Sequence, residues 1–521
     1  MQSTAFKTVV VLGCAYGGAR ATSQLASTLP AGWKLVVIDR NTHVNHVYVL
    51  PRLLVLPGNE PKGFVPYTGI FNHGGFSKGP ADTLSLHAIV TSLTPTSVTL
   101  DKSFPEHRYP DGVINFDYCV YALGSQLPDP VNLWGRSLES VTPIKTEQEQ
   151  EEVAPQLVKE VYNGTKKQSL AWMERTRIRI EEAQSILVVG GGALGVQMSS
   201  DIAELHPDKK ITLLHSRDKL LNRFDEEVHT QALLSLDALN VTTILGERLA
   251  TWPDESCKGT FRTSKGTEVT VDLILMCTGQ KPNTQLLTTM DPRTVDPKTG
   301  MAKVKRTMQL ARLPSAPPPS ISPLESAHQM AGAAPVDSVA EQFAGLAVNR
   351  TQVEIEARKE EDTVGEEEDA AYPHIFVVGD AADAFGALKA GHTAYWQADT
   401  ACKNIIKLIK AGEPAEPAPA VVVADLVDDD TSSIDGDSQC GDDSDLDSED
   451  EESKVTEEDD GKLLEYAPGP PAIKVTLGIK HSVHQVNGEI GTKDDGTEDC
   501  GAGLIWPYFG FKIETEADYL K

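Results

Sequence analysis

Two stretches of the chain share one order of apolar and glycine-rich segments. In the first, an apolar, β-branched run over 8–12 leads through Gly13 and Gly18 into a small-residue segment over 19–29, and a second apolar run follows over 34–38. Unbroken apolar runs of this length, bounded by glycine, are typical of strands buried on both faces of a parallel sheet. The pattern therefore predicts a strand–helix–strand unit at the start of the chain.

The spacing within this first unit is that of a dinucleotide-binding turn. Gly13, Ala15 and Gly18 follow the strand, and Asp39 ends the second strand 21 positions after Gly18, close to the ~20 expected for an acid that binds a ribose hydroxyl. Gly13 makes the tight turn, Gly18 allows close helix–strand packing, and the helix N-terminus faces the pyrophosphate. Ala15 departs from the pattern, with Gly17 beside it. A glycine-rich turn without a ligand is the alternative, which Asp39 disfavours.

The same pattern recurs about 180 residues later. An apolar run over 185–189 precedes Gly190, Gly192 and Gly195, which complete a G-x-G-x-x-G motif, and a helical segment and a further apolar run over 210–214 follow. Two such units in one chain are much more specific for dinucleotide binding than either alone.

The second unit ends without an acid. Its last strand runs into His215, Ser216 and Arg217. An acid at this position binds the 2′-hydroxyl of NAD, whereas an arginine accommodates the 2′-phosphate of NADP. The sequence leaves two interpretations open: Arg217, with its two neighbours, receives that phosphate, or it is an exposed arginine in a surface loop.

Later segments add further strands. Short strands are expected over 82–122, a buried strand over 269–276, and another over 375–378 that ends in Gly379-Asp380 and leads into a helix-rich segment over 381–409. Strands that alternate with helices predict an α/β fold with parallel sheets.

The charge of the chain is concentrated in one tract. The 521 residues carry a net charge of −29 with 40% hydrophobic residues, enough for sizeable cores. Residues 413–460 hold 20 acids and one lysine, so the rest of the chain is only mildly acidic. The tract is expected to be disordered, and residues 307–370, which are rich in Pro, Ser and Ala and end in an acidic run, to be a partly disordered insertion. An acidic chain is a poor nucleic-acid binder.

Seven scattered cysteines without a C-x-x-C pair predict neither a disulfide scaffold nor a metal site, and they favour a reducing compartment. The first strand starts by Thr8, which leaves no room for a signal or transit peptide. Gln2 excludes N-myristoylation, and no run of about 18 apolar residues predicts a membrane span. A cytoplasmic protein is expected, with peripheral membrane contact left open.

The two glycine motifs, the Thr278-Gly279 turn and the Gly379-Asp380 turn occur in the order found in one enzyme superfamily. The chain resembles the flavoprotein reductases with two dinucleotide-binding domains. Within them it is similar to the apoptosis-inducing-factor-like group that includes the ferroptosis suppressor protein. The resemblance covers Lys7 to about Ala411, except 307–370, and more weakly 462–521.

The resemblance implies an FAD site and a site for NAD(P)H. It assigns the first turn to FAD through Gly13, Cys14, Ala15, Tyr16, Gly17 and Gly18. It further assigns Asp39 to the FAD ribose, Arg52 to the flavin nucleotide, Ala88 to the adenine, and Asp380, after Gly379, to the ribityl chain.

The second turn, with Gly190, Gly192 and Gly195, is assigned by the same resemblance to NAD(P)H. Lys389 matches by spacing a lysine near the flavin and is the catalytic candidate; a surface helix lysine is the alternative. His43 and His46 follow the first unit and are weaker catalytic candidates.

The expected fold class is α/β, with two Rossmann-like FAD/NAD(P)-binding domains of the three-layer ββα type. The expected domains are 1–139 and 286–411 for FAD, 140–285 for NAD(P)H, 412–461 as an acidic linker and 462–521 as a C-terminal appendage. The resemblance implies an FAD-dependent oxidoreductase that passes a hydride from NAD(P)H to flavin and electrons to a quinone-like acceptor. The alternatives are a reductase of a small iron–sulfur protein and a low-turnover, flavin-bound signalling protein.

Overall fold

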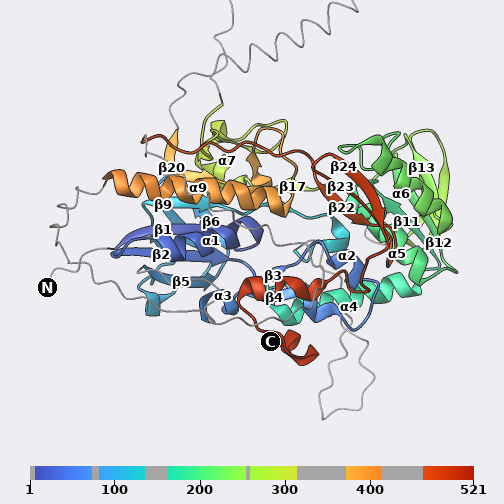
Figure 1. The fold of residues 1–521 in the computed structure, drawn as a ribbon, viewed down its shortest axis with the longest axis horizontal. Helices are drawn as coiled ribbons and strands as arrows, with labels where there is room; N and C mark the ends of the chain where they lie inside the picture. Colours follow the sequence, from blue (N-terminus) through green and yellow to red (C-terminus); the bar gives the residue numbers. More distant parts are fainter. Residues whose placement is uncertain (1–5, 73–80, 135–161, 254–257, 314–370, 413–460) are drawn as a thin grey trace, which may run out of the picture.

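The computed structural model describes residues 6–72, 81–134, 162–253, 258–313, 371–412 and 461–521. The acidic tract and most of the expected 307–370 insertion lie outside these ranges. Two main sheets lie side by side along the long axis of the molecule, with the first turn on one and the second turn on the other (Figure 1).

The first sheet has six strands, in the order β19-β20-β9-β1-β2-β5. Their bounds are β1 (Lys7–Leu12), β2 (Trp33–Asp39), β5 (Asp82–His87), β9 (Tyr118–Tyr121), β19 (Gln309–Leu310) and β20 (Tyr372–Val377). All pairs are parallel except β19–β20, and β1 is central, with Val9 opposite Leu35 and Tyr118. The apolar run of β1 is buried on both faces from Val9 to Leu12, as its sequence predicts.

One face of this sheet is covered by two helices, α1 (Tyr16–Thr28) and α9 (Gly391–Gly412), which pack against each other (Figure 1). The helix expected over 381–409 begins only at Gly391, because residues 379–383 form a 3-10 turn and the short strand β21 (Ala382–Asp383). A three-stranded sheet of β6 (Val90–Leu93), β7 (Ser97–Leu100) and β8 (Val113–Asn115) forms a separate layer.

The second main sheet has the order β13-β12-β11-β16 and is entirely parallel. Its strands are β11 (Ser185–Val189), β12 (Lys210–His215), β13 (Thr242–Leu245) and β16 (Leu273–Met276), and its helices are α4 (Lys166–Glu182), α5 (Ala193–Leu205) and α6 (Glu226–Ala238). The expected strand over 269–276 is two strands: β15 (Glu268–Val271) pairs with β14 (Gly259–Arg262), and β16 joins the sheet. The break falls at Asp272, whose carboxylate accepts hydrogen bonds from Ser185 N at 2.9 Å and Ser185 Oγ at 2.8 Å.

Short elements connect the two halves. They are β3 (His43–Asn45), α2 (Leu50–Leu53), β4 (Phe64–Pro66), α3 (Thr68–Asn72), β10 (Ser125–Gln126), β17 (Lys281–Pro282), α7 (Gln285–Met290) and β18 (Ala302–Lys303). The antiparallel pair β10–β17 joins the two crossings of the chain between the halves.

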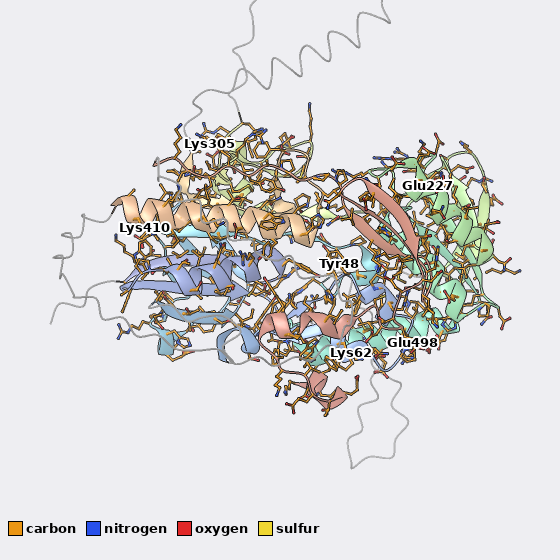
Figure 2. All side chains as sticks on the ribbon, in the orientation of Figure 1. Tyr48, Lys62, Glu227, Lys305, Lys410 and Glu498 are labelled. Atoms are coloured by element: carbon orange, nitrogen blue, oxygen red, sulfur yellow. The ribbon has the colours of Figure 1, made fainter. Side chains whose placement is uncertain are left out.

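The C-terminal segment, residues 461–521, is built into the body rather than appended to it. Its sheet of β22 (Ile473–Thr476), β23 (Ser482–Val486) and β24 (Glu489–Lys493) packs on α5 and α6 of the second half. Its last part forms 3-10 turns beside the first half, where Trp506 is fully buried and donates from Nε1 to the Lys62 carbonyl at 3.0 Å. Lys62 lies next to these turns (Figure 2). No helix in the described ranges is long and apolar enough to cross a membrane.

Candidate functional site

A cavity of about 490 Å³ lies at the carboxyl ends of the strands of the six-stranded sheet. Its walls come from the turns that follow β1, β2, β9 and β20 and from the start of α9, with residues 13, 15–18, 38–41, 88–90, 121–125, 131–134, 280, 378–380 and 389–391 among them. Ligands of open α/β sheets bind at this edge. Tyr48 lines the cavity and lies near the middle of the molecule (Figure 2).

The first glycine turn forms one wall and leaves no room for a side chain at Gly13 or Gly18. Gly13 has a φ of +89°, and a Cβ there would lie 2.6 Å from the Ala122 carbonyl oxygen. A Cβ at Gly18 would come closer than 3.0 Å to the Gly13 carbonyl oxygen. The backbone of helix and strand is therefore in direct contact here. Ala15, whose methyl departs from the sequence motif, is the N-cap of α1 and lines the cavity, and Tyr16 begins the helix at the strained φ of +27°.

Asp39 lies at the end of β2 in the same cavity, as predicted for a ribose-binding acid. Its Oδ2 accepts hydrogen bonds from Cys14 N at 2.7 Å and from the Tyr67 hydroxyl at 3.3 Å, and its Oδ1 accepts from Asn41 N at 2.7 Å. Burial raises the pKa of Asp39, and the two backbone N–H groups oppose that rise. Asp39 therefore anchors the turn as well as facing the cavity.

At the other side of the cavity, Asp380 follows β20. Its Oδ2 accepts hydrogen bonds from Ser125 Oγ and Gln280 Nε2, both at 2.7 Å. Burial raises the pKa of Asp380, and the positive charge of Lys389 lowers it. Lys389 is exposed and lies at the cavity wall. The structure thus brings Asp39 to one cavity with Asp380 and Lys389, which lie more than 340 positions later in the sequence.

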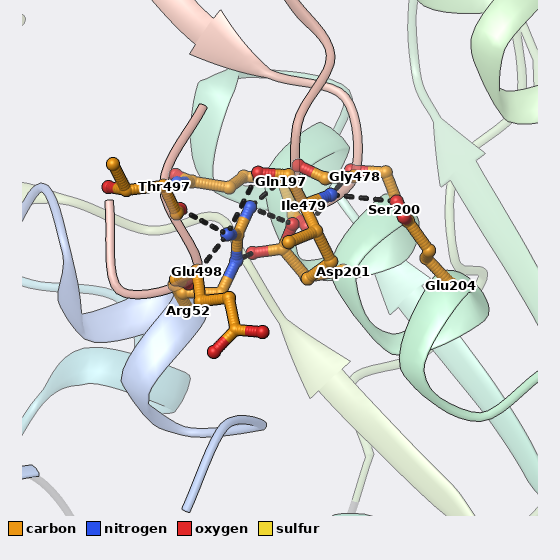
Figure 3. Close-up of polar contacts among 9 residues, drawn as sticks. All are labelled: Arg52, Gln197, Ser200, Asp201, Glu204, Gly478, Ile479, Thr497 and Glu498. Atoms are coloured by element: carbon orange, nitrogen blue, oxygen red, sulfur yellow. Dashed lines mark hydrogen bonds and ion pairs between the residues drawn. The ribbon is translucent and has the colours of Figure 1, made fainter. Parts of the chain in front are cut away.

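The structure corrects the predicted flavin contact of Arg52. Its side chain is fully buried and does not line the cavity. The guanidinium forms a bidentate pair with Asp201, at 2.8 and 2.9 Å, and donates to the carbonyls of Gly478 at 2.6 Å and Glu498 at 2.8 Å (Figure 3). Arg52 therefore joins α2, α5 and the C-terminal segment, and its donors are occupied.

The contacts of Cys14 lie within the turn and do not point to a nucleotide contact. Its backbone N–H is used by Asp39, and its buried Sγ lies 3.9 Å from Thr22 Oγ1. The predicted Ala88 lies in the cavity wall, between β5 and β6.

Two residues that sequence reasoning missed line the cavity beyond Asp39. The guanidinium of Arg40 stacks on the Trp134 ring, with its Cζ 4.6 Å from the ring centroid, and Trp134 Nε1 donates to Asn41 Oδ1 at 2.9 Å. Arg40 directly follows Asp39, the predicted ribose-binding acid, and this is the only sign in the local sequence that Arg40 lies at the site. The sequence around Asp39 does not point to Trp134, because this residue belongs to a different segment of the chain.

The candidate histidines have different roles. His43 is buried in β3, hydrogen-bonded to Ser169 Oγ at 2.9 Å, and burial lowers its pKa to about 3. It is a core residue. His46 Nδ1 lies 3.2 Å from the Tyr16 hydroxyl, and burial lowers its pKa to about 4. His46 is therefore uncharged at neutral pH, beside the rings of Tyr16 and Tyr48.

The second glycine turn repeats the construction of the first. A Cβ at Gly190 would lie 2.8 Å from the Cys277 carbonyl oxygen, and a Cβ at Gly195 would come closer than 3.0 Å to the Gly190 carbonyl oxygen. Gly192, the N-cap of α5, has open space around it. Arg217 is exposed in the loop after β12. This turn does not line the cavity of the first sheet.

Residues 7–313 match the sequence profile of the pyridine nucleotide-disulphide oxidoreductases. The chain belongs to this family. Fe-regulated protein 8 of Mycosarcoma maydis is 33% identical over 99% of this chain and 98% of that protein. Apoptosis-inducing factor homolog B of Dictyostelium discoideum is 27% identical over 54% of this chain and 65% of that protein, and ferroptosis suppressor protein 1 of Taeniopygia guttata is 28% identical over 53% and 63%. The resemblance drawn from the paired turns is thereby confirmed.

The cofactors of this oxidoreductase family are FAD and NAD(P)H. Both glycine turns fit a dinucleotide, because each brings a helix N-terminus to the end of a parallel strand, with glycines where helix and strand backbones meet. The family name refers to disulphide chemistry, but Cys14, Cys119 and Cys402 are buried and form no disulfide. Burial raises the pKa of each of these three thiols, which makes them poor nucleophiles.

Proposed function

We propose that this flavin oxidoreductase transfers reducing equivalents from NAD(P)H to a quinone-like acceptor. The observation that carries the proposal is the cavity in which the first glycine turn, Asp39 and Asp380 meet, with Lys389 at its wall. FAD, when bound, accepts a hydride and releases electrons to an acceptor. The protein supplies binding, orientation and electrostatics.

Each of these residues has a separate role that follows from its position in the cavity. Asp39 is suited to accept from ribose hydroxyls at one side of the cavity. Asp380, held by Ser125 and Gln280, is suited to accept from the hydroxyls of a ribityl chain. Lys389 adds positive charge where negative charge develops during electron transfer, whereas His46, whose pKa burial lowers to about 4, adds no charge at neutral pH.

The support for a quinone-like acceptor is the wall around Tyr48. Tyr16 and Tyr48 face each other edge to face with ring centroids 5.4 Å apart, and Val47, Leu127 and Leu133 add apolar surface. A flat aromatic acceptor matches aromatic and apolar walls of this kind. The described surface offers no comparable argument for an iron–sulfur protein.

Steady-state oxidation of NADPH by the flavin-loaded protein tests the proposal. We expect turnover with a soluble quinone and little with a small iron–sulfur protein. Turnover with the iron–sulfur protein alone would favour the reductase alternative. A protein that holds flavin but turns over neither acceptor would favour the signalling alternative.

We expect Lys389→Met to lower kcat by roughly tenfold, below the ~100- to 1000-fold cost of removing a buried donor, because Lys389 is exposed. Stopped-flow spectra would separate flavin reduction from reoxidation. Lys410→Met, which changes another exposed lysine, on the last turn of α9, is the control. Equal rates in the two variants would show that Lys389 is a surface lysine without a catalytic role.

The exposed Arg217 gives a prediction for cofactor choice. Charged hydrogen bonds contribute about 1.5–3 kcal/mol each, so a phosphate contact corresponds to a preference of roughly 10- to 150-fold. We expect NADPH to exceed NADH in kcat/KM, and Arg217→Ala to lose most of that preference. Arg262→Ala, an exposed arginine on β14, is the control. An unchanged ratio in Arg217→Ala would mean that its side chain faces solvent.

A further inference from the structure

The two glycine turns are held by the same pair of hydrogen bonds. In the first, Gly13 N donates to the Ile38 carbonyl at 2.8 Å and Cys14 N donates to Asp39 Oδ2 at 2.7 Å. In the second, Gly190 N donates to the Leu214 carbonyl at 2.8 Å, and the next amide donates to a histidine ring nitrogen. The side chain at the end of the following strand fixes the turn in both halves.

His215 is that histidine, and it stands where Asp39 stands in the first half. Its Nδ1 lies 3.0 Å from Gly191 N. A Cβ at Gly191 would lie 2.5 Å from Leu220 Cδ2 and 2.6 Å from Cγ of the His215 ring, so these two side chains pack against this position and favour glycine there. In the first turn Cys14 stands at the equivalent position, because the smaller carboxylate of Asp39 leaves room for its side chain.

Asp39 and His215, the two side chains that anchor the turns, differ in charge. The Gly191 N–H can only donate, so Nδ1 of His215 carries a lone pair and the ring is neutral. Burial lowers the pKa of His215; a backbone hydrogen bond with Lys219 raises it, and the charges of Arg217 and His229 lower it. The nearby acid Glu247 is hydrogen-bonded by Thr263. An uncharged anchor therefore ends β12, whereas a carboxylate ends β2.

We propose that His215 determines nucleotide specificity by replacing the acid of this position with an uncharged acceptor. It keeps the turn in its binding conformation and removes the negative charge that would repel a 2′-phosphate. His215 thus allows a 2′-phosphate to bind at this strand end, and the contact of that phosphate with Arg217 depends on it. This inference rests on the proposed function, since it concerns the nucleotide that this turn binds.

Binding of NADP+ and NAD+ to the FAD-loaded protein, measured by isothermal titration calorimetry, tests the proposal without turnover. The unmodified protein is expected to bind NADP+ more tightly. His215→Asp gives the second turn the acid that Asp39 provides in the first. The ratio of the two Kd values should then shift toward NAD+ by about tenfold or more, because the new carboxylate repels the 2′-phosphate of NADP+. In His215→Asn, whose amide oxygen is an uncharged acceptor, the ratio should stay within about twofold.

An unchanged ratio in His215→Asp, or an equal shift in His215→Asn, would overturn the proposal. A second measurement needs no variant: the unmodified protein should bind 2′,5′-ADP more tightly than 5′-AMP, and equal affinities would also overturn it. Failure of the proposed function is distinguishable, because a protein that binds neither NADP+ nor NAD+ has no pyridine-nucleotide site at all.

Discussion

A Gly18→Val variant is expected to purify without FAD. A Cβ at Gly18 already comes closer than 3.0 Å to the Gly13 carbonyl oxygen, and the obstacle is backbone, which cannot rotate away. Valine would push the start of α1 off the strand and displace the amides that face a pyrophosphate. The absorbance of the purified protein between 350 and 500 nm, roughly the range of oxidised flavin absorption, reports the FAD content directly.

Two matched variants make the result specific. Gly469→Val changes a glycine with open space around it, and it should keep its flavin. Gly195→Val creates in the second turn the clash that Gly18→Val creates in the first, so it should keep flavin and lose NADP+ binding. A folded Gly18→Val protein with full flavin content would show that the first turn does not hold FAD.

Arg52→Met is expected to lower the free energy of unfolding by about 3–5 kcal/mol, the usual cost of leaving one charge of a buried pair without its partner. Both side chains of the Arg52–Asp201 pair are 0% exposed, and the carbonyls of Gly478 and Glu498 lose their donor at the same time. Urea unfolding would give the loss of stability. Limited proteolysis should show earlier cleavage within 461–521.

The control is a pair of the same chemistry on the surface. Arg262 and Glu268 are 67% and 54% exposed, so Arg262→Met should change stability by less than about 1 kcal/mol. If Arg52→Met and Arg262→Met unfold at the same urea concentration, the buried pair does not hold the parts of the molecule together.

The sequence identifies the two turns and Asp39 because their pattern is local. Strand, glycine spacing, helix and terminal acid all fall within about 30 residues, and backbone sterics at Gly13 and Gly18 allow few other residue types. Strand and helix identities followed from the same local periodicity. The division of the expected strand at Asp272 was not predicted, because it depends on a hydrogen bond to Ser185 on a neighbouring strand.

Arg52 shows why a residue can be assigned wrongly to the site from the sequence. Its partner Asp201 is 149 positions away, and the Glu498 carbonyl is 446 positions away. A buried arginine and a ligand-binding arginine look identical in a sequence, and only the tertiary packing separates them. His215 is the converse case: its position in the motif was visible, but its role in holding Gly191 required the geometry of the ring.

The six-stranded sheet has a consequence for synthesis on the ribosome. Strand β9 ends at Tyr121 and its parallel neighbour β20 begins at Tyr372, so about 250 residues, including the whole second sheet, are made between them. At typical translation speeds this takes roughly 13–50 s. During that time the open edge of β9 exposes unpaired N–H and C=O groups. We expect the second half to fold first, and nascent chains to depend on chaperones until Val377 has emerged.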